Sequence, residues 1–152
     1  MSDHDATPAR AAYLDPRLVV LVLIGGAAGT LARALLEDAF PAEPGQWPWT
    51  TFAINVSGSF LLGLLVSLLA SRGDDTGSRR RLRLALGTGV LGGFTTYSTF
   101  IVEVDVLVRD GHVGLGAAYA VGAVVLGVVA AALGVILGGA AQTPTDPDEA
   151  GA

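Results

Sequence analysis

The sequence contains no cysteine, no lysine and only two histidines, His4 and His112, among its 152 residues. Without cysteine the chain can form neither a disulfide framework nor a thiolate metal site. The two histidines lie in an N-terminal stretch and a short connection, which leaves little material for a zinc site, a haem site or a Ser-His-Asp triad. We therefore expect a protein that is not an enzyme.

Charge is also scarce, because only 15% of the residues are charged while 51% are hydrophobic. A helix that crosses roughly 30 Å of hydrocarbon needs about 20 mostly apolar residues. Four stretches qualify, at about 18–36, 49–70, 84–108 and 113–139. The sequence therefore predicts an all-α integral membrane protein, a four-helix unit over 17–139 in the lipid bilayer. The stretches 1–16 and 140–152, rich in Ala, Asp, Pro and Thr, are predicted to be disordered tails.

The arginines are distributed unevenly between the two sides of the predicted membrane unit. Four spans place the N-terminal tail, the loop 71–83 and the C-terminal tail on one side. That side carries seven of the nine arginines: Arg10, Arg17, Arg72, Arg79, Arg80, Arg81 and Arg83. The positive-inside rule then predicts a multi-pass protein of the inner or plasma membrane with both termini in the cytoplasm. The run "SRRRLR" has a second interpretation as an anionic-lipid or nucleic-acid patch, but topology explains it more simply, and we expect no nucleic-acid partner.

Glycine is abundant, with 21 residues. Small residues four apart on a membrane helix let two backbones approach closely, and they drive association where lipid provides no hydrophobic contrast. This spacing occurs at Gly25 and Gly29 and at Gly134 and Gly138, and nearly so at Gly58 and Gly63. Most of the glycines therefore predict a compact bundle or an oligomer.

The stretch "GGFTTYSTF", residues 92–100, differs from this packing pattern. It places two glycines and a cluster of hydroxyl side chains near the middle of the third apolar stretch, where glycine weakens a helix. Non-helical backbone at membrane depth survives only where protein or water covers it, and interrupted helices often bind ions. The sequence therefore predicts that the third helix is interrupted at the membrane midplane. A second polar insertion, "NVSGSF", contributes Asn55, which either joins helices or faces a substrate path.

Three segments together carry a resemblance to a known family: "GGAAGTLAR", "NVSGSF", and "GGFTTYSTF" followed by "VE". In this order, and in a chain of this length, they resemble the Fluc (CrcB) family of fluoride channels over roughly residues 18–139. The resemblance implies an antiparallel dimer with two fluoride pathways along the subunit interface. It also implies a central structural sodium ion (Na⁺) held by the backbone carbonyls of Gly92 and Thr95.

The resemblance further assigns roles to individual side chains. Asn55 would donate its amide to fluoride, and Tyr97 and Phe100 would present aromatic ring edges to the ion. The remaining matches are the hydroxyls of Ser98 and Thr99, Tyr119 of the fourth span, and a basic and an acidic position at Arg33 and Glu103. Hydroxyl and amide donors can replace the water around fluoride without a full positive charge that would trap the ion.

The sequence departs from the family pattern at two places. Tyr97 stands where the family usually has phenylalanine, so its hydroxyl is expected either to narrow the path or to act as a donor. In the fourth span Tyr119 is present, but Ala123 and Gly127 occupy the turns where the family typically has serines. The hydroxyl track of the fourth span is therefore expected to be incomplete.

The arginine bias adds an expectation about assembly. An antiparallel homodimer requires one chain to insert in both orientations, whereas this chain is biased toward one. We therefore expect a heterodimer with a paralogue of opposite orientation. Two alternatives are a small proton-coupled multidrug exporter, which would need a carboxylate inside the first span before Glu37, and a non-conducting partner subunit.

Overall fold

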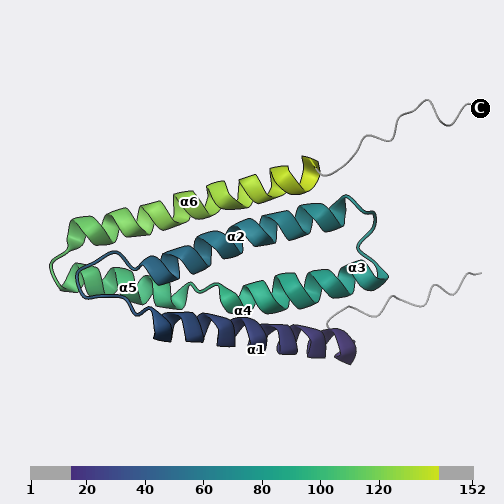
Figure 1. Ribbon diagram of the computed structural model, residues 1–152, viewed down its shortest axis with the longest axis horizontal. Coiled ribbons are helices and arrows are strands. Elements are labelled where there is room, and N and C mark those ends of the chain that lie inside the picture. The colour runs from purple at the N-terminus through teal and green to yellow at the C-terminus, as the bar shows by residue number, and fades with distance from the viewer. Residues whose placement is uncertain (1–14, 141–152) are drawn as a thin grey trace, which may run out of the picture.

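The computed structural model describes residues 15–140, and all regular structure in that range is helical (Figure 1). The elements are α1 (Pro16–Ala39), α2 (Trp49–Ala70), α3 (Gly77–Leu82), η2 (Arg83–Leu91), α4 (Gly92–Phe94), α5 (Ser98–Arg109) and α6 (Val113–Ala140). Helices α3, η2, α4 and α5 together form the third span, and four spans are long and apolar enough to cross a membrane. The predicted fold class is confirmed. The predicted tails fall almost entirely outside the described residues.

Helix α1 begins at Pro16, two residues before the predicted start of the first span. The side chain of Asp15 accepts a hydrogen bond of 3.0 Å from the backbone N–H of Arg17, and proline at the first helical position has no N–H to satisfy. Pro16 was assigned to the N-terminal tail on the sequence, and this assignment is wrong because local capping extends the helix beyond the apolar stretch.

The third span also begins earlier than predicted, at Gly77 rather than Leu84. The segment Gly77–Leu82 is too polar to be detected by its hydropathy, yet it forms a helical turn. Arg83 reaches back to Asp75 with an ion pair of 2.7 Å, which ties this turn to the connection before it. The hydrogen bond from Arg83 also lowers the pKa of Asp75 below its ordinary value.

Element η2 is π-helical, with backbone hydrogen bonds that span five residues, as from the N–H of Gly92 to the carbonyl of Gly87. π-Helical turns are rare and often lie next to functional segments. Here the π-helical stretch runs directly into α4 and the interruption that follows. Gly89 of this stretch lies directly against Gly25 of α1, so the two backbones are in close contact there.

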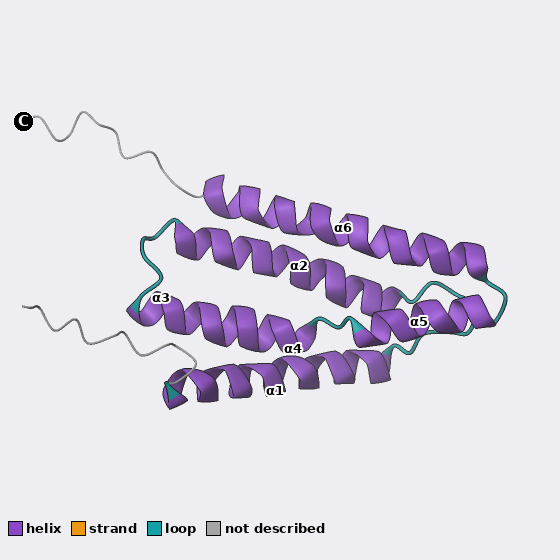
Figure 2. Ribbon diagram, turned by 180° about the vertical axis from the view of Figure 1, so that it is seen from behind, coloured by secondary structure: helices purple, strands orange, loops and turns teal. Residues whose placement is uncertain are grey.

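The spans lie side by side in the order α6, α2, third span, α1 (Figure 2). Helix α2 packs mainly on α6, and α1 packs mainly on η2 and α4. Beyond the interruption, α5 packs on α6 instead. The two halves of the third span therefore have different principal neighbours.

Glycines allow the closest contacts between neighbouring helices. A Cβ on Gly25 would lie 3.1 Å from the backbone nitrogen of Val90, and one on Gly134 would lie 2.7 Å from that of Leu64. Such distances leave no room for a methyl group, because the obstructing atoms belong to backbone. The glycine pairs noted in the sequence therefore lie at helix contacts, as predicted from small-residue packing.

A small apolar core lies where α5 and α6 meet. Phe100, Leu107 and Tyr119 are buried there, with Trp47 packed against them. By contrast, many large apolar side chains of α1 and α6 face outward, among them Leu23, Ile24, Val121, Val128 and Ile136. Exposed apolar faces of this extent on helices of spanning length suit contact with lipid hydrocarbon or with another subunit.

Candidate functional site

The centre of the candidate site is the interruption of the third span at Thr95–Tyr97. Helix α4 ends at Phe94, Thr95 is extended with φ −75° and ψ 153°, and α5 begins at Ser98. The carbonyl of Leu91 accepts hydrogen bonds from both the N–H of Thr95 (3.0 Å) and its hydroxyl (2.9 Å). The threonine hydroxyl thus helps to close the last turn before the chain leaves the helix. The predicted interruption is confirmed.

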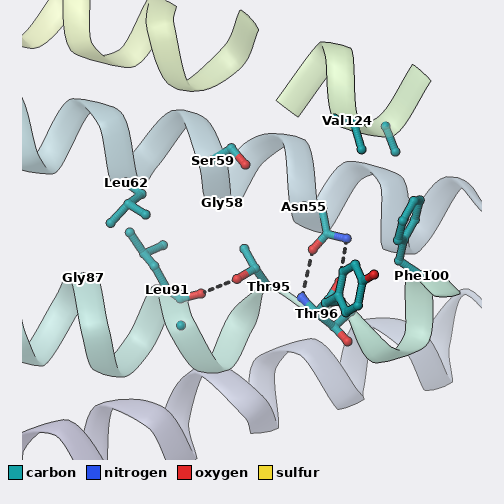
Figure 3. A pocket seen from close by; sticks show the side chains of 13 residues that line it. Asn55, Gly58, Ser59, Leu62, Gly87, Leu91, Thr95, Thr96, Phe100 and Val124 are labelled. Atoms are coloured by element: carbon teal, nitrogen blue, oxygen red, sulfur yellow. Dashed lines mark hydrogen bonds between the residues drawn. The ribbon is translucent and has the colours of Figure 1, made fainter. Parts of the chain in front are cut away.

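Asn55 of α2 binds the backbone N–H and C=O of Thr96, which have no partner within the interrupted helix (Figure 3). Its Oδ1 accepts a hydrogen bond of 2.9 Å from the backbone N–H of Thr96, and its Nδ2 donates one of 2.8 Å to the carbonyl of the same residue. A side-chain amide is the group that can satisfy a peptide N–H and a C=O at once. One of its two N–H donors therefore serves the backbone, which leaves the other for a ligand.

A second support comes from α1, on the other side of the interruption. The carbonyl of Gly93 accepts hydrogen bonds of 3.4 Å from the hydroxyl of Thr30 and from Nε of Arg33. Arg33 also forms an ion pair of 3.0 Å with Glu37, one helical turn along α1. Arg33, a predicted site residue, therefore lies at the interruption with its charge partly balanced by Glu37.

The start of α5 is organised by Thr96. Its hydroxyl accepts a hydrogen bond of 3.2 Å from the N–H of Thr99, and lies 3.2 Å from the hydroxyl of Thr99 and 3.3 Å from that of Ser98. This caps the first turn of α5 in the manner of a helix N-cap. The predicted pathway hydroxyls of Ser98 and Thr99 are thus gathered around Thr96, a residue to which sequence reasoning assigned no role of its own.

Two backbone carbonyls are left without hydrogen bonds by this arrangement. In a continuous helix the Gly92 carbonyl would accept from Thr96, and the Thr95 carbonyl from Thr99. Those N–H groups bind Asn55 and the Thr96 hydroxyl instead, and within residues 15–140 no other donor reaches either carbonyl. Free carbonyl oxygens are the ligands that a hard cation prefers. The donor set at Gly92 and Thr95 therefore fits part of a sodium site.

A cavity of about 350 Å³ opens beside the interruption, between α2, the third span and α6. Asn55, Ser59 and Thr96 give it polar atoms, and both Gly92 and Thr95 border it. Its α6 side is formed by Ala123 and Val124, which supply no polar side chain. The predicted site residues that border the cavity are Asn55, Gly92, Thr95, Tyr97 and Phe100, whereas Ser98 and Thr99 do not border it. The polar groups of the cavity come from α2 and the third span.

The two aromatic residues predicted for the fluoride pathway, Tyr97 and Phe100, differ in their exposure. Tyr97 is 76% exposed, whereas Phe100 is 8% exposed, and their ring centroids lie 6.2 Å apart. Both border the cavity. Phe100 also meets the ring of Tyr119 edge to face at 5.2 Å. Tyr97 is therefore free to turn, while Phe100 is fixed by the core.

Glu103 and Tyr119 form a separate polar cluster behind Phe100. One carboxylate oxygen of Glu103 accepts a hydrogen bond of 2.7 Å from the hydroxyl of Thr51, and the other accepts one of 2.7 Å from that of Tyr119. Tyr119 is fully buried and does not border the cavity. Sequence reasoning missed Thr51, although it stands one helical turn before Asn55 on the same face of α2.

Comparison with known proteins identifies the family. Residues 20–135 match the family described as CrcB-like protein, Camphor Resistance (CrcB). The chain belongs to this family, as the sequence motifs predicted.

Several curated relatives are similar over most of their length. The chain is 49% identical over 128 residues to "Fluoride-specific ion channel FluC 2" of Leifsonia xyli subsp. xyli, covering 84% of this chain and 88% of the relative. It is 45% identical over 136 residues to "Fluoride-specific ion channel FluC 1" of Cutibacterium acnes, covering 85% and 95%. It is 44% identical over 123 residues to the FluC 1 of Mycobacterium tuberculosis, covering 81% and 91%. These relatives are named as ion channels, which agrees with the expectation that the chain is not an enzyme.

Proposed function

We propose that the chain is a subunit of a fluoride-selective channel that lets fluoride leave the cytoplasm passively. The observation that carries this proposal is the cavity at the broken third span, where hydrogen-bond donors and aromatic rings meet at the centre of a membrane helix. A pore for a strongly hydrated anion has to replace water with donors, and its binding must remain weak enough for release. Relatives named as fluoride-specific channels support the choice of ion.

The groups available to fluoride on this chain are neutral. Asn55 keeps one amide N–H beyond the one that binds Thr96. Ser98 is exposed, and the hydroxyls of Ser98 and Thr99 stand at the start of α5. The ring edges of Tyr97 and Phe100 add a weakly positive surface. Together these groups provide attraction without a fixed cation in the path.

We further propose that the Gly92 and Thr95 carbonyls hold a structural sodium ion. Two oxygens do not complete the coordination of a hard cation, so a second subunit would have to supply the remainder. An antiparallel dimer with the interruptions facing each other would do so. The ion would then act as structure and as a fixed positive charge rather than as cargo.

The arginine bias favours one insertion direction, and we propose that both termini are cytoplasmic and that the partner is an oppositely oriented paralogue. The α6 side of the cavity is apolar at Ala123 and Val124. This supports a heterodimer, because the partner subunit would supply the missing polar groups. The same observation favours a second candidate function, a non-conducting partner subunit. A proton-coupled multidrug exporter is less well supported, because α1 has no carboxylate before Glu37.

The test is fluoride efflux from proteoliposomes that contain the chain alone or the chain purified with a co-expressed homologue. Tyr97→Ile in this chain should reduce efflux at least tenfold in whichever assembly conducts, because the exposed ring borders the cavity and its loss does not disturb the core. Val102→Ile, an exposed position on α5 away from the cavity, is the matched control. Unchanged efflux in the Tyr97→Ile complex would favour the non-conducting subunit. Absence of fluoride efflux from every assembly would reject the channel.

A further inference from the structure

A second pocket, of about 600 Å³, lies at the end of the bundle where α1 and α3 begin (Figure 1). Arg17 at the start of α1 and Arg81 of α3 line it from two different spans. Leu18, Val20 and Leu21 form its apolar part, and they lead into the membrane-spanning portion of α1. The pocket therefore combines positive charge at the end of the bundle with an apolar wall that continues along a spanning helix.

The side chains of the two arginines of this pocket have no partner within residues 15–140, unlike those of Arg79 and Arg83. Arg79 donates to backbone carbonyls of its own connection, and Arg83 pairs with Asp75 at 2.7 Å. The guanidinium groups of Arg17 and Arg81 make no hydrogen bond or ion pair within residues 15–140. Asp15 also borders the pocket, but its carboxylate caps α1 by accepting the N–H of Arg17. Among the described residues, the pocket thus carries more positive than negative charge.

We propose that this pocket binds the headgroup phosphate of an anionic phospholipid, with an acyl chain lying along α1. A guanidinium presents several N–H donors in a plane that matches phosphate oxygens, and two from separate spans can hold one phosphate. Basic pockets between spans at the membrane surface suit anionic headgroups. Exposed apolar side chains of α1, such as Val20, Leu23 and Ile24, continue from the pocket toward the membrane interior and provide the surface for the chain. A phosphate free in solution would gain nothing from that surface.

Such a lipid would join α1 to the beginning of the third span at the end remote from α5. The inference stands independently of fluoride conduction, since it uses none of the residues at the cavity beside the interruption. It predicts that anionic lipid binds with defined stoichiometry and stabilises the folded protein.

The experiment is native mass spectrometry of the full-length chain, in the assembly in which it purifies, with phosphatidylglycerol or phosphatidylcholine added at equal concentration. The wild-type protein should retain phosphatidylglycerol at least fivefold more than phosphatidylcholine, and its melting temperature in detergent should rise by several degrees with phosphatidylglycerol only. Arg17→Gln and Arg81→Gln should each lose most of this preference. Arg72→Gln is the control with the same change of charge, because Arg72 lies between α2 and α3, outside the pocket, and donates to the carbonyl of Leu68 in α2.

Any of four outcomes would overturn the proposal. The first is equal retention of the two lipids by the wild-type protein. The second is an equal loss in Arg72→Gln, which would mean that only the overall charge matters. The third is competition by soluble glycerol phosphate at the same concentration as the lipid, which would show that the pocket binds phosphate without using the apolar wall. Retention that persists in both Arg17→Gln and Arg81→Gln would place the lipid elsewhere.

Discussion

Asn55 and Thr96, 41 residues apart in the chain, are joined by two hydrogen bonds that close a ring between the side-chain amide and one peptide unit. The N–H of Thr96 and its C=O would each be paired within a continuous helix, and here both are paired by α2 instead. A buried peptide group without a partner costs about 1–3 kcal/mol. The interruption of the third span is therefore stabilised by a residue of another helix.

This relationship predicts a large effect for Asn55→Leu, which has a similar size and no polar atoms. We expect a loss of about 2–5 kcal/mol in the free energy of unfolding, because two backbone groups of Thr96 lose their partners at once. Fluoride efflux should fall at least tenfold in the conducting assembly. Ser57→Ala is the control, since the Ser57 hydroxyl binds only carbonyls of its own helix. Comparable melting temperatures for the two variants would show that the Thr96 backbone does not need Asn55.

Close helix contact at Gly25 predicts that even one methyl group destabilises the bundle. In Gly25→Ala the new Cβ would collide with the backbone of η2, including the nitrogen of Val90 at 3.1 Å. Overpacking of this kind costs about 1–3 kcal/mol, and it should appear as a lower melting temperature. Gly114→Ala makes the same chemical change in open space on α6 and should be neutral or slightly stabilising. If Gly25→Ala and Gly114→Ala melt alike, α1 does not pack on η2 as described.

The cluster at Glu103 predicts energetic coupling between α2 and α6, because each of these helices supplies one hydroxyl donor to the Glu103 side chain. Thr51→Val and Tyr119→Phe each remove one hydroxyl donor from Glu103, and each should cost about 1–3 kcal/mol because an oxygen of a partly buried carboxyl group loses its partner. Since both donors serve one carboxylate, the double variant should differ from the sum of the single variants by at least about 0.5 kcal/mol. Melting temperatures of the four proteins in one detergent give this cycle. Strict additivity would mean that the two hydroxyls act independently.

The carbonyls of Gly92 and Thr95 predict a specific response to sodium. Replacement of Na⁺ by N-methylglucamine at constant ionic strength should lower the melting temperature of the assembled protein, because the oxygens then lose their cation. Potassium, which is larger, should restore less of the lost stability than sodium. Gel filtration in the two buffers serves as the readout of assembly. A melting temperature that is independent of the cation would argue against a sodium site.

The interruption was predictable because its causes are local in the sequence. Gly92 and Gly93 weaken the helix, and the hydroxyls of Thr95 and Thr96 offer the backbone alternative partners within a few residues. The extent of α2 was predictable for a similar reason, since Trp49–Ala70 is mostly apolar and contains no charged residue. Periodic and compositional signals of this kind need no knowledge of the tertiary structure.

Other features depend on how the helices are placed against one another, which one sequence does not reveal. The sequence indicated that Asn55 either joins helices or faces a path, and only the register of α2 against the third span assigns its partner to Thr96. The burial of Tyr119 away from the cavity follows from the contact of α5 with α6. The π-helical stretch η2 left no compositional trace, because its residues also suit an ordinary helix.

The change of neighbours along the third span has a consequence for how the protein tolerates substitutions. Residues 83–94 pack mainly on α1, whereas residues 98–109 pack mainly on α6. Only three residues connect these two segments. A substitution that disturbs α1 should thus displace the segment that contains the Gly92 carbonyl. A substitution that disturbs α6 should displace the segment that contains Phe100. Destabilising substitutions in this chain should therefore fall into two groups, one that displaces the Gly92 carbonyl and one that displaces the Phe100 ring.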